Sequence, residues 1–429
     1  MPDQSPDAAL TRSLPARVTP LVLSAALLLG ANGLSMTVIA VRGREEGLSD
    51  AMIGLLGSAY YLGLLLGVLV TPFLIMRVGH IRVFAALASV SAVVMMVLLL
   101  IPAGPLWLVA RFASGIAFCG TAMVVESWLN ALASNAERGR VLSVYRIVDL
   151  AAVTGAQFLL PLYGAGGYEI LVLIALLFSA GLVPVALARE GNPPVHVKRK
   201  LDLAEIWRIS PVAVVGCLTI GLTNGAFRSI GPLYAQGVGL GVDAVAFFIS
   251  LWIVAGAIFQ YPLGWASDRV DRRLVLMLAT IGAGLSCLLV AGTTDRMIIF
   301  TGIFLFGGFA LPLYSLSAAH ANDHAEPGQY VELAAGLTLS FALGAVIGPF
   351  AASLVIDMFG PRAFFIYTSV LHFALVGFIA LRIAARASVP EARRQPFVWL
   401  LRYSPMIYRL ARNGAGQANA GKREKEPRK

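Results

Sequence analysis

The stretch LGANGLSMTVIAVRGREEGL, residues 29–48, has a diverged copy in GLTNGAFRSIGPLYAQGVGL, residues 221–240. Shared residues are separated by 192 positions (224 against 32, for example), and the spacing recurs beyond these stretches. The coinciding residues are Asn32-Gly33 with Asn224-Gly225, Gly47-Leu48 with Gly239-Leu240, Arg77 with Arg269, and Gly115 with Gly307. In a hydrophobic chain this repeat predicts two similar bundles of membrane helices, with a ligand site where the bundles meet.

The composition indicates an integral membrane protein in contact with the lipid bilayer. Hydrophobic residues make up 58% of the chain and charged residues 13%, whereas soluble domains carry about 25% charged residues. The net charge of +10 resides in short connections and in the C-terminal tail. Membrane topology places basic residues there, so we expect no nucleic-acid partner.

Apolar stretches long enough to span a bilayer predict an all-α fold of twelve transmembrane helices. The predicted spans are 20–41, 51–75, 83–102, 107–132, 141–163, 168–188, 211–234, 244–266, 274–293, 297–320, 331–356 and 362–385. The predicted domains are an N-terminus (1–19), a six-helix bundle (20–188), a linker (189–210), a second six-helix bundle (211–385) and a basic tail (386–429).

Basic residues are concentrated in the connections on one side of the predicted membrane. That side carries Arg77, Arg82, Arg138, Arg140, Lys198, Arg199, Lys200, Arg208, Arg269, Arg272 and Arg273. Positive residues favour the cytoplasm, so both termini are expected there. We also predict two amphipathic surface segments, residues 201–207 and 397–412.

The loop after the eighth span resembles the signature of the major facilitator superfamily, Gly-x-Leu-Ala-Asp-Arg-x-Gly-Arg-Arg. It matches at Gly264, Asp268, Arg269, Arg272 and Arg273 and departs at Ala266 and Asp271. The repeat copy after the second span keeps Leu74, Arg77, Gly79 and a basic Arg82, but Met76 replaces the acid. The resemblance covers all twelve spans and is closest to a little-characterised bacterial branch. It implies a monomeric transporter of the bacterial inner membrane, with two pseudo-symmetric halves around a central cavity.

The signature residues suit a cytoplasmic latch. Asp268 can lie against a helix N-terminus, and the arginines can bridge to carboxylates on adjacent helices; alternatively, they only fix topology. In the first half, where Met76 replaces the signature acid, we expect Glu126 to supply the carboxylate of the latch. The basic turn Arg138-Gly139-Arg140 follows it in the sequence. A proton site or a substrate contact are the other interpretations of Glu126.

A few charged and amide side chains lie within the predicted spans, where they mark candidates for a substrate cavity or for proton coupling. Arg111 and Gly115 resemble the Arg-x-x-x-Gly motif that is linked to proton coupling in some members of the superfamily; snorkelling to the headgroups is the alternative for Arg111. Arg146 and Asp149, at i and i+3, share a helix face and can pair. Asn32, Asn224 and Arg228 complete the predicted set, and a buried structural network is the alternative.

Other motifs carry less weight for function. Gly344, Gly348 and Pro349 match an antiporter motif of the superfamily but on the wrong span, so we assign them, with Gly115, to helix packing. His320 and His324 have a metal-like spacing without a third ligand, and no metal is predicted. A phosphate-binding loop is absent from the sequence, and no cofactor or enzymatic activity is expected.

We therefore predict a secondary active transporter of a small organic solute, working by alternating access and coupled to protons. Arg228 and Arg111 favour an anionic substrate, and the sequence leans slightly to efflux. Two alternatives stay open: multidrug efflux of neutral or cationic compounds, and a transporter-like sensor that binds its ligand without moving it.

Overall fold

The structure is a computed structural model that describes residues 14–101, 103–134, 137–187, 203–326, 329–385 and 397. Over this part of the chain the regular elements are helices, and twelve of the spans they form are long and apolar enough to cross a membrane. The predicted all-α fold with twelve spans is confirmed. Residues 1–13, most of the linker and the tail apart from Phe397 lie outside the described residues.

The first half of the chain forms six spans from seven helices. They are α2 (Leu14–Glu45), α3 (Asp50–Val78), α4 (His80–Leu100), α5 (Leu106–Leu132), α6 (Arg138–Gln157) with α7 (Leu159–Tyr163), and α8 (Glu169–Ala186). Each is about as long as a bilayer requires, since a helix rises about 1.5 Å per residue.

The second half repeats this arrangement after the short helix α9 (Leu203–Ile209). Its spans are α10 (Pro211–Ile220) with the π-helix η1 (Gly221–Gly225) and α11 (Ala226–Gly237), α12 (Val242–Arg269), α13 (Arg272–Ala291), α14 (Arg296–Ala310) with α15 (Leu313–Asn322), α16 (Tyr330–Phe359) and α17 (Ala363–Ala385).

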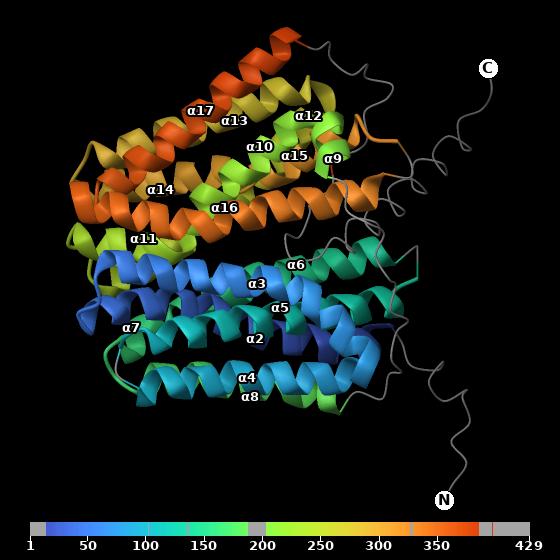
Figure 1. Ribbon diagram of the computed structural model, residues 1–429, viewed down its shortest axis with the longest axis vertical. Coiled ribbons are helices and arrows are strands. Elements are labelled where there is room, and N and C mark those ends of the chain that lie inside the picture. Colours follow the sequence, from blue (N-terminus) through green and yellow to red (C-terminus); the bar gives the residue numbers. More distant parts are fainter. Residues whose placement is uncertain are drawn as a thin grey trace, which may run out of the picture.

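The two halves lie side by side as separate bundles, the first in blue to green and the second in yellow-green to red (Figure 1). The end of the molecule at which α2 begins and α17 ends is called here the terminal face; it lies to the right in Figure 1. The other end is called the opposite face. The loops α3–α4 and α12–α13, which carry the signature residues, belong to the terminal face.

The sequence repeat is also a structural repeat. Gly47 and Gly239 both turn the chain at positive φ, 81° and 85°. Gly115 packs so closely that a Cβ would collide with the Tyr60 carbonyl oxygen, and Gly307 packs in the same way on the Trp252 carbonyl oxygen. Small residues permit such close approach of membrane helices, which supports the packing role predicted for Gly115.

The bundles are joined most closely in the half of the membrane near the opposite face. A Cβ added to Gly57 of α3 would lie 2.7 Å from the Ser229 Cβ on α11 and 2.9 Å from the Pro349 Cβ on α16. Arg44 Nη1 on α2 also donates to the Leu233 carbonyl on α11, at 3.1 Å. These contacts seal the space between the bundles toward the opposite face.

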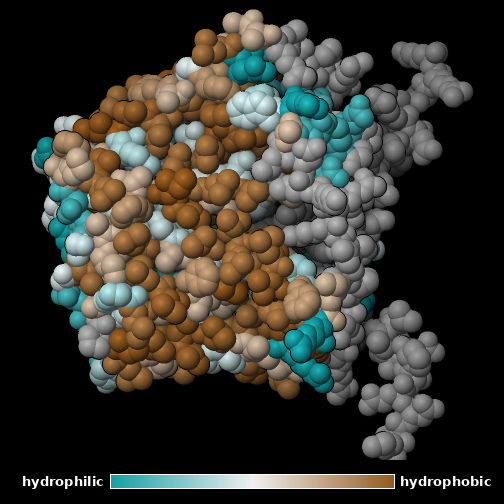
Figure 2. All heavy atoms as spheres, in the orientation of Figure 1, coloured by the Kyte–Doolittle hydropathy of each residue, from teal (hydrophilic) through white to brown (hydrophobic). Residues whose placement is uncertain are grey.

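The surface of the bundles is a broad apolar band with hydrophilic side chains toward the two ends (Figure 2). This distribution fits a lipid-facing protein. The short helix predicted in the linker is present as α9, where Ile206 is buried against Gly336 of α16 and Trp207 is 48% exposed. The other predicted surface segment, 397–412, lies outside the described residues except for Phe397.

Candidate functional site

A cavity lies between the bundles. Both halves of the chain line it. The lining residues are Leu29, Asn32, Phe118, Arg146, Asp149, Leu150, Val153, Arg228, Trp252, Ile253, Gly256, Ala257, Gln260, Leu311 and Ser315. Along α12 the lining runs from Trp252 to Gln260, so the cavity extends from mid-membrane toward the terminal face.

The predicted pair on α6 is formed in the cavity wall. Arg146 Nη1 donates to Asp149 Oδ2 at 2.6 Å, and the two side chains are 24% and 11% exposed. The i, i+3 spacing places both groups on one helix face. The pair therefore presents one basic and one acidic side chain to the cavity between the bundles.

Arg228 enters the cavity from the second bundle. It lies one turn after η1, where wider π-turns replace the regular helix. Single π-turns are frequent at functional sites, because they re-aim the side chains that follow. With Arg146 and Asp149, Arg228 gives the cavity lining two basic residues and one acidic residue.

Asn224 does not lie beside Arg228 in the cavity as predicted. Its Nδ2 donates to the Ala310 carbonyl at 3.2 Å and its side chain is buried, so it ties η1 to α14. Gly344 and Gly348 of α16 pack on the backbone of the same region, against Leu218 and Leu222. These contacts support the packing role predicted for the two glycines.

Arg111 is buried within the first bundle, 2% exposed, instead of lining the cavity or reaching the headgroups. Its guanidinium lies 4.5 Å from the centre of the Tyr60 ring, and Nη2 is 2.7 Å from Met36 Sδ. A cation over an aromatic face is a favourable arrangement away from water. The Tyr60 hydroxyl donates to Asn32 Oδ1 at 3.0 Å, which connects Arg111 to the cavity wall through two side chains.

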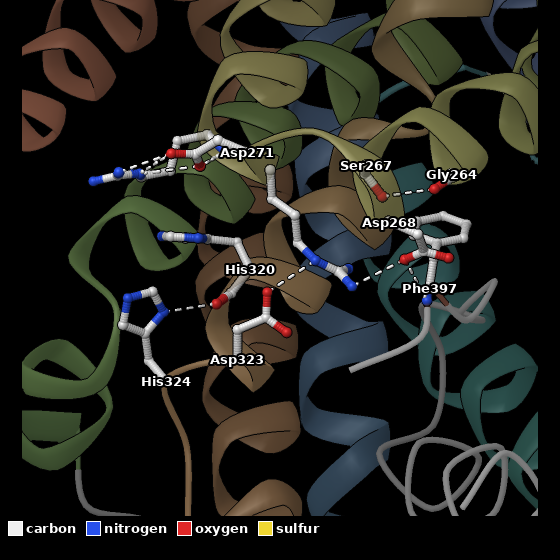
Figure 3. A network of polar contacts seen from close by, with 10 residues as sticks. Gly264, Ser267, Asp268, Asp271, His320, Asp323, His324 and Phe397 are labelled. Atoms are coloured by element: carbon white, nitrogen blue, oxygen red, sulfur yellow. Dashed lines mark hydrogen bonds and ion pairs between the residues drawn. The ribbon is translucent and has the colours of Figure 1, made fainter. Parts of the chain in front are cut away.

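The signature residues of the second half form a polar network at the terminal face (Figure 3). Arg272 Nε lies 2.9 Å from Oδ2 of Asp323, the C-cap residue of α15, and Arg272 Nη2 lies 3.0 Å from Asp268 Oδ1. Asp323 and Arg272 are almost fully buried, at 3% and 2% side-chain exposure. The predicted bridge from an arginine to a carboxylate on an adjacent helix is therefore present, and it joins α12, α13 and α15.

The other signature residues surround this network. Asp271 caps α13 by accepting from the Arg273 backbone N–H at 3.0 Å, and its Oδ2 pairs with Arg273 Nη2 at 2.8 Å. Arg269 stacks on the Trp265 ring, 4.1 Å from its centre. His324 Nδ1 lies 2.9 Å from the His320 carbonyl oxygen, so the His324 ring is within hydrogen-bond distance of the His320 backbone.

The first half has a different arrangement at the corresponding positions. His80, which takes the place of Arg272 in the repeat, lies 3.2 Å from Ser127 Oγ and stacks on Trp128 of α5. Glu126 is buried beside them on α5, at 1% exposure. The Arg77, Arg82 and Arg140 side chains are exposed, and the Arg138 side chain lies outside the described atoms.

Several residues of the cavity were not predicted from the sequence. Phe118, Trp252 and Gln260 line it, and Tyr60 supports it through Asn32. Phe118 and Trp252 carry no polar signal, and Gln260 is a single amide in an apolar span. The spacing of 192 offers one signal for Trp252, since Tyr60 is its counterpart in the first half.

Comparisons with known proteins agree with this architecture. The model of the Major Facilitator Superfamily matches residues 21–256 and 213–415. The chain belongs to this superfamily and is a multi-pass bacterial membrane transporter without enzymatic activity.

Individual relatives and solved structures give the same result. An uncharacterized MFS-type transporter of Enterobacter sp. (strain 638) is 26% identical over 353 residues, covering 81% of this chain and 91% of the relative. The uncharacterized MFS-type transporter YcaD of Escherichia coli O6:K15:H31 (strain 536 / UPEC) is 26% identical, with 87% and 97% covered. The crystal structure of the nucleoside transporter NupG has a TM-score of 0.73 at 12% identity, covering 86% of this chain and 99% of that one. At this identity the likeness is one of fold.

Proposed function

We propose that the chain is a proton-coupled secondary transporter of a small organic anion, with the central cavity as its binding site. The observation that carries this proposal is the shared lining of the cavity by Arg146, Asp149 and Arg228, contributed by both bundles. At neutral pH these three residues bring a formal charge of +1, because two arginines face one aspartate. Ionisable groups inside a membrane protein mark substrate and proton pathways.

Alternating access supplies the movement. The concentration of basic residues in the connections of the terminal face supports its assignment to the cytoplasm. The seal at Gly57 and Arg44 then closes the outer side, and the cavity faces inward. Rocking the two bundles about the cavity would open the outer side and close the inner one.

Asp149 is the group we propose for proton coupling. Protonation would neutralise the Asp149 carboxylate and break its ion pair with Arg146, which makes the cavity lining more positive and favours an anion. Proton binding and anion binding then favour each other. Protonation removes the negative charge of Asp149, which repels an anion, and a bound anion in turn raises the affinity of Asp149 for a proton. Such coupling favours co-transport. The efflux that the sequence favours would instead require anion binding to expel the proton.

Flux in reconstituted vesicles tests the proposal. Purified protein in liposomes would be offered radiolabelled small organic acids and neutral analogues of equal size, with and without an imposed proton gradient. The proposal predicts gradient-dependent accumulation of acids and none of the neutral analogues. Gradient-driven flux of neutral or cationic compounds would contradict the anion assignment, and ligand binding without flux would indicate a sensor.

A further inference from the structure

Phe397, from the segment that follows α17, is seated on the signature loop of α12. Its backbone N–H donates to Asp268 Oδ1 at 2.9 Å (Figure 3). Its ring covers Gly264, where an added Cβ would lie 2.6 Å from the ring Cε1. The ring is partly buried against the hydrophobic core. Phe397 thus contacts both the acid (Asp268) and the first glycine (Gly264) of the signature.

The seat of Phe397 continues the cavity wall. Gln260, Gly264 and Asp268 follow one another at intervals of four residues, and residues at i and i+4 share a helix face. Gln260 lines the cavity. Phe397 therefore occupies the same stripe of α12, one to two turns closer to the terminal face.

This stripe is the surface that the first bundle has to reach when the cavity closes on the terminal side. The helices α12 and α6 already meet near the opposite face, where Ser250 Oγ donates to the Thr154 carbonyl at 3.5 Å. Their repeat counterparts, α3 and α16, make the seal at Gly54 and Gly57. Because α6 begins and α12 ends at the terminal face, rocking the bundles about these contacts brings the beginning of α6 toward the end of α12, around Gly264.

We propose that Phe397 is an intramolecular wedge that holds the terminal side open and leaves its seat each time that side closes. Its ring and the beginning of α6 compete for Gly264, and its N–H takes the Asp268 oxygen that a helix N-terminus would otherwise meet. Occupancy of this seat by Phe397 then sets the balance between the form that is open at the terminal face and the form that is closed there. This inference rests on the alternating access proposed above.

Distances between spin labels on α6 and α12 test the wedge. Cysteines would replace Val144 and Tyr261, both exposed, in full-length protein whose buried native cysteines are changed to serine. The short distance reports closure of the terminal side. Phe397→Ala is expected to raise the ratio of short to long distances about tenfold, corresponding to about 1.4 kcal/mol.

Two further variants make the test specific. Phe397→Leu keeps a bulky apolar side chain over Gly264 and should shift the ratio less than Phe397→Ala does. Phe359→Ala removes an exposed ring at the opposite face and should leave the ratio unchanged.

The outcomes separate the wedge from the function on which it rests. If the labelled protein with Phe397 shows both distances and Phe397→Ala leaves their ratio unchanged, the wedge proposal is wrong and alternating access stands. If every sample shows only the long distance, with organic acids and at every pH tested, alternating access fails and the wedge with it.

Discussion

Arg146 and Asp149 form an ion pair of 2.6 Å in the wall of the cavity that Arg228 enters from the other bundle. The pair combines one basic and one acidic residue of the lining, and Arg228 adds a second basic residue from the facing wall. A change at Asp149 therefore alters the charge of the whole site. Glu126, a second buried acid, is not among the cavity-lining residues in the described chain.

This contrast predicts which acid couples transport to protons. Asp149→Asn should abolish the effect of a proton gradient on flux while anion binding persists, because the amide resembles a permanently protonated acid. Glu126→Gln is the matched variant and should keep the pH dependence of flux. Liposome flux measured from pH 5 to pH 8 checks both. A normal pH profile in Asp149→Asn, or its loss in Glu126→Gln alone, would reverse the assignment.

Gly307 predicts a stability effect of helix packing. Gly307→Ala should destabilise the protein by about 1–3 kcal/mol, because its Cβ collides with the Trp252 backbone carbonyl and forces α14 from α12. Gly377→Ala on α17 meets nothing within 4 Å and should be neutral or stabilise by about 0.4–1 kcal/mol. Thermal unfolding in detergent measures both. Equal melting temperatures for the two variants would show that the close approach is not required.

The network at the terminal face predicts an order of effects. Asp323→Asn should lower stability by about 3–5 kcal/mol, since it leaves the buried Arg272 with a weakened partner at the end of α15. Asp268→Asn should cost less, because Asp268 is 35% exposed and water screens its interaction with Arg272. Thermal unfolding gives the order, and cysteine labelling at the terminal face reports whether the loop loosens. The reverse order would mean that Asp268 is the main support of Arg272.

The length of the apolar stretches was enough to predict the spans, because the bilayer fixes the length of a helix that crosses it. The Arg146–Asp149 pair was also predictable, since i, i+3 geometry is local. The rotation of each helix about its own axis could not be predicted, although this rotation decides which side chains reach the cavity. Spans that are apolar on all sides give no periodic signal for rotation, and packing sets it instead.

Arg111 and Asn224 illustrate this limit. Both are polar groups in apolar spans, and the sequence marks them as candidates for the substrate cavity or for proton coupling. Packing turns Arg111 toward the Tyr60 ring, and the π-turn η1 directs Asn224 to the Ala310 carbonyl. Their polar character predicts that each is buried against a partner. The identity of that partner could not be predicted, because it lies far away in the sequence.

The central claim is that Arg228 binds an anion in the cavity, and ligand-induced thermal stabilisation tests it most directly. Purified protein would be screened against small organic acids and neutral analogues, since a bound ligand raises apparent stability by mass action. Arg228→Ala would be compared with Arg208→Ala, whose side chain is 79% exposed on α9. Stabilisation by an acid that persists in Arg208→Ala and disappears in Arg228→Ala is the predicted result. Stabilisation by neutral or cationic compounds that is unchanged in Arg228→Ala would contradict it.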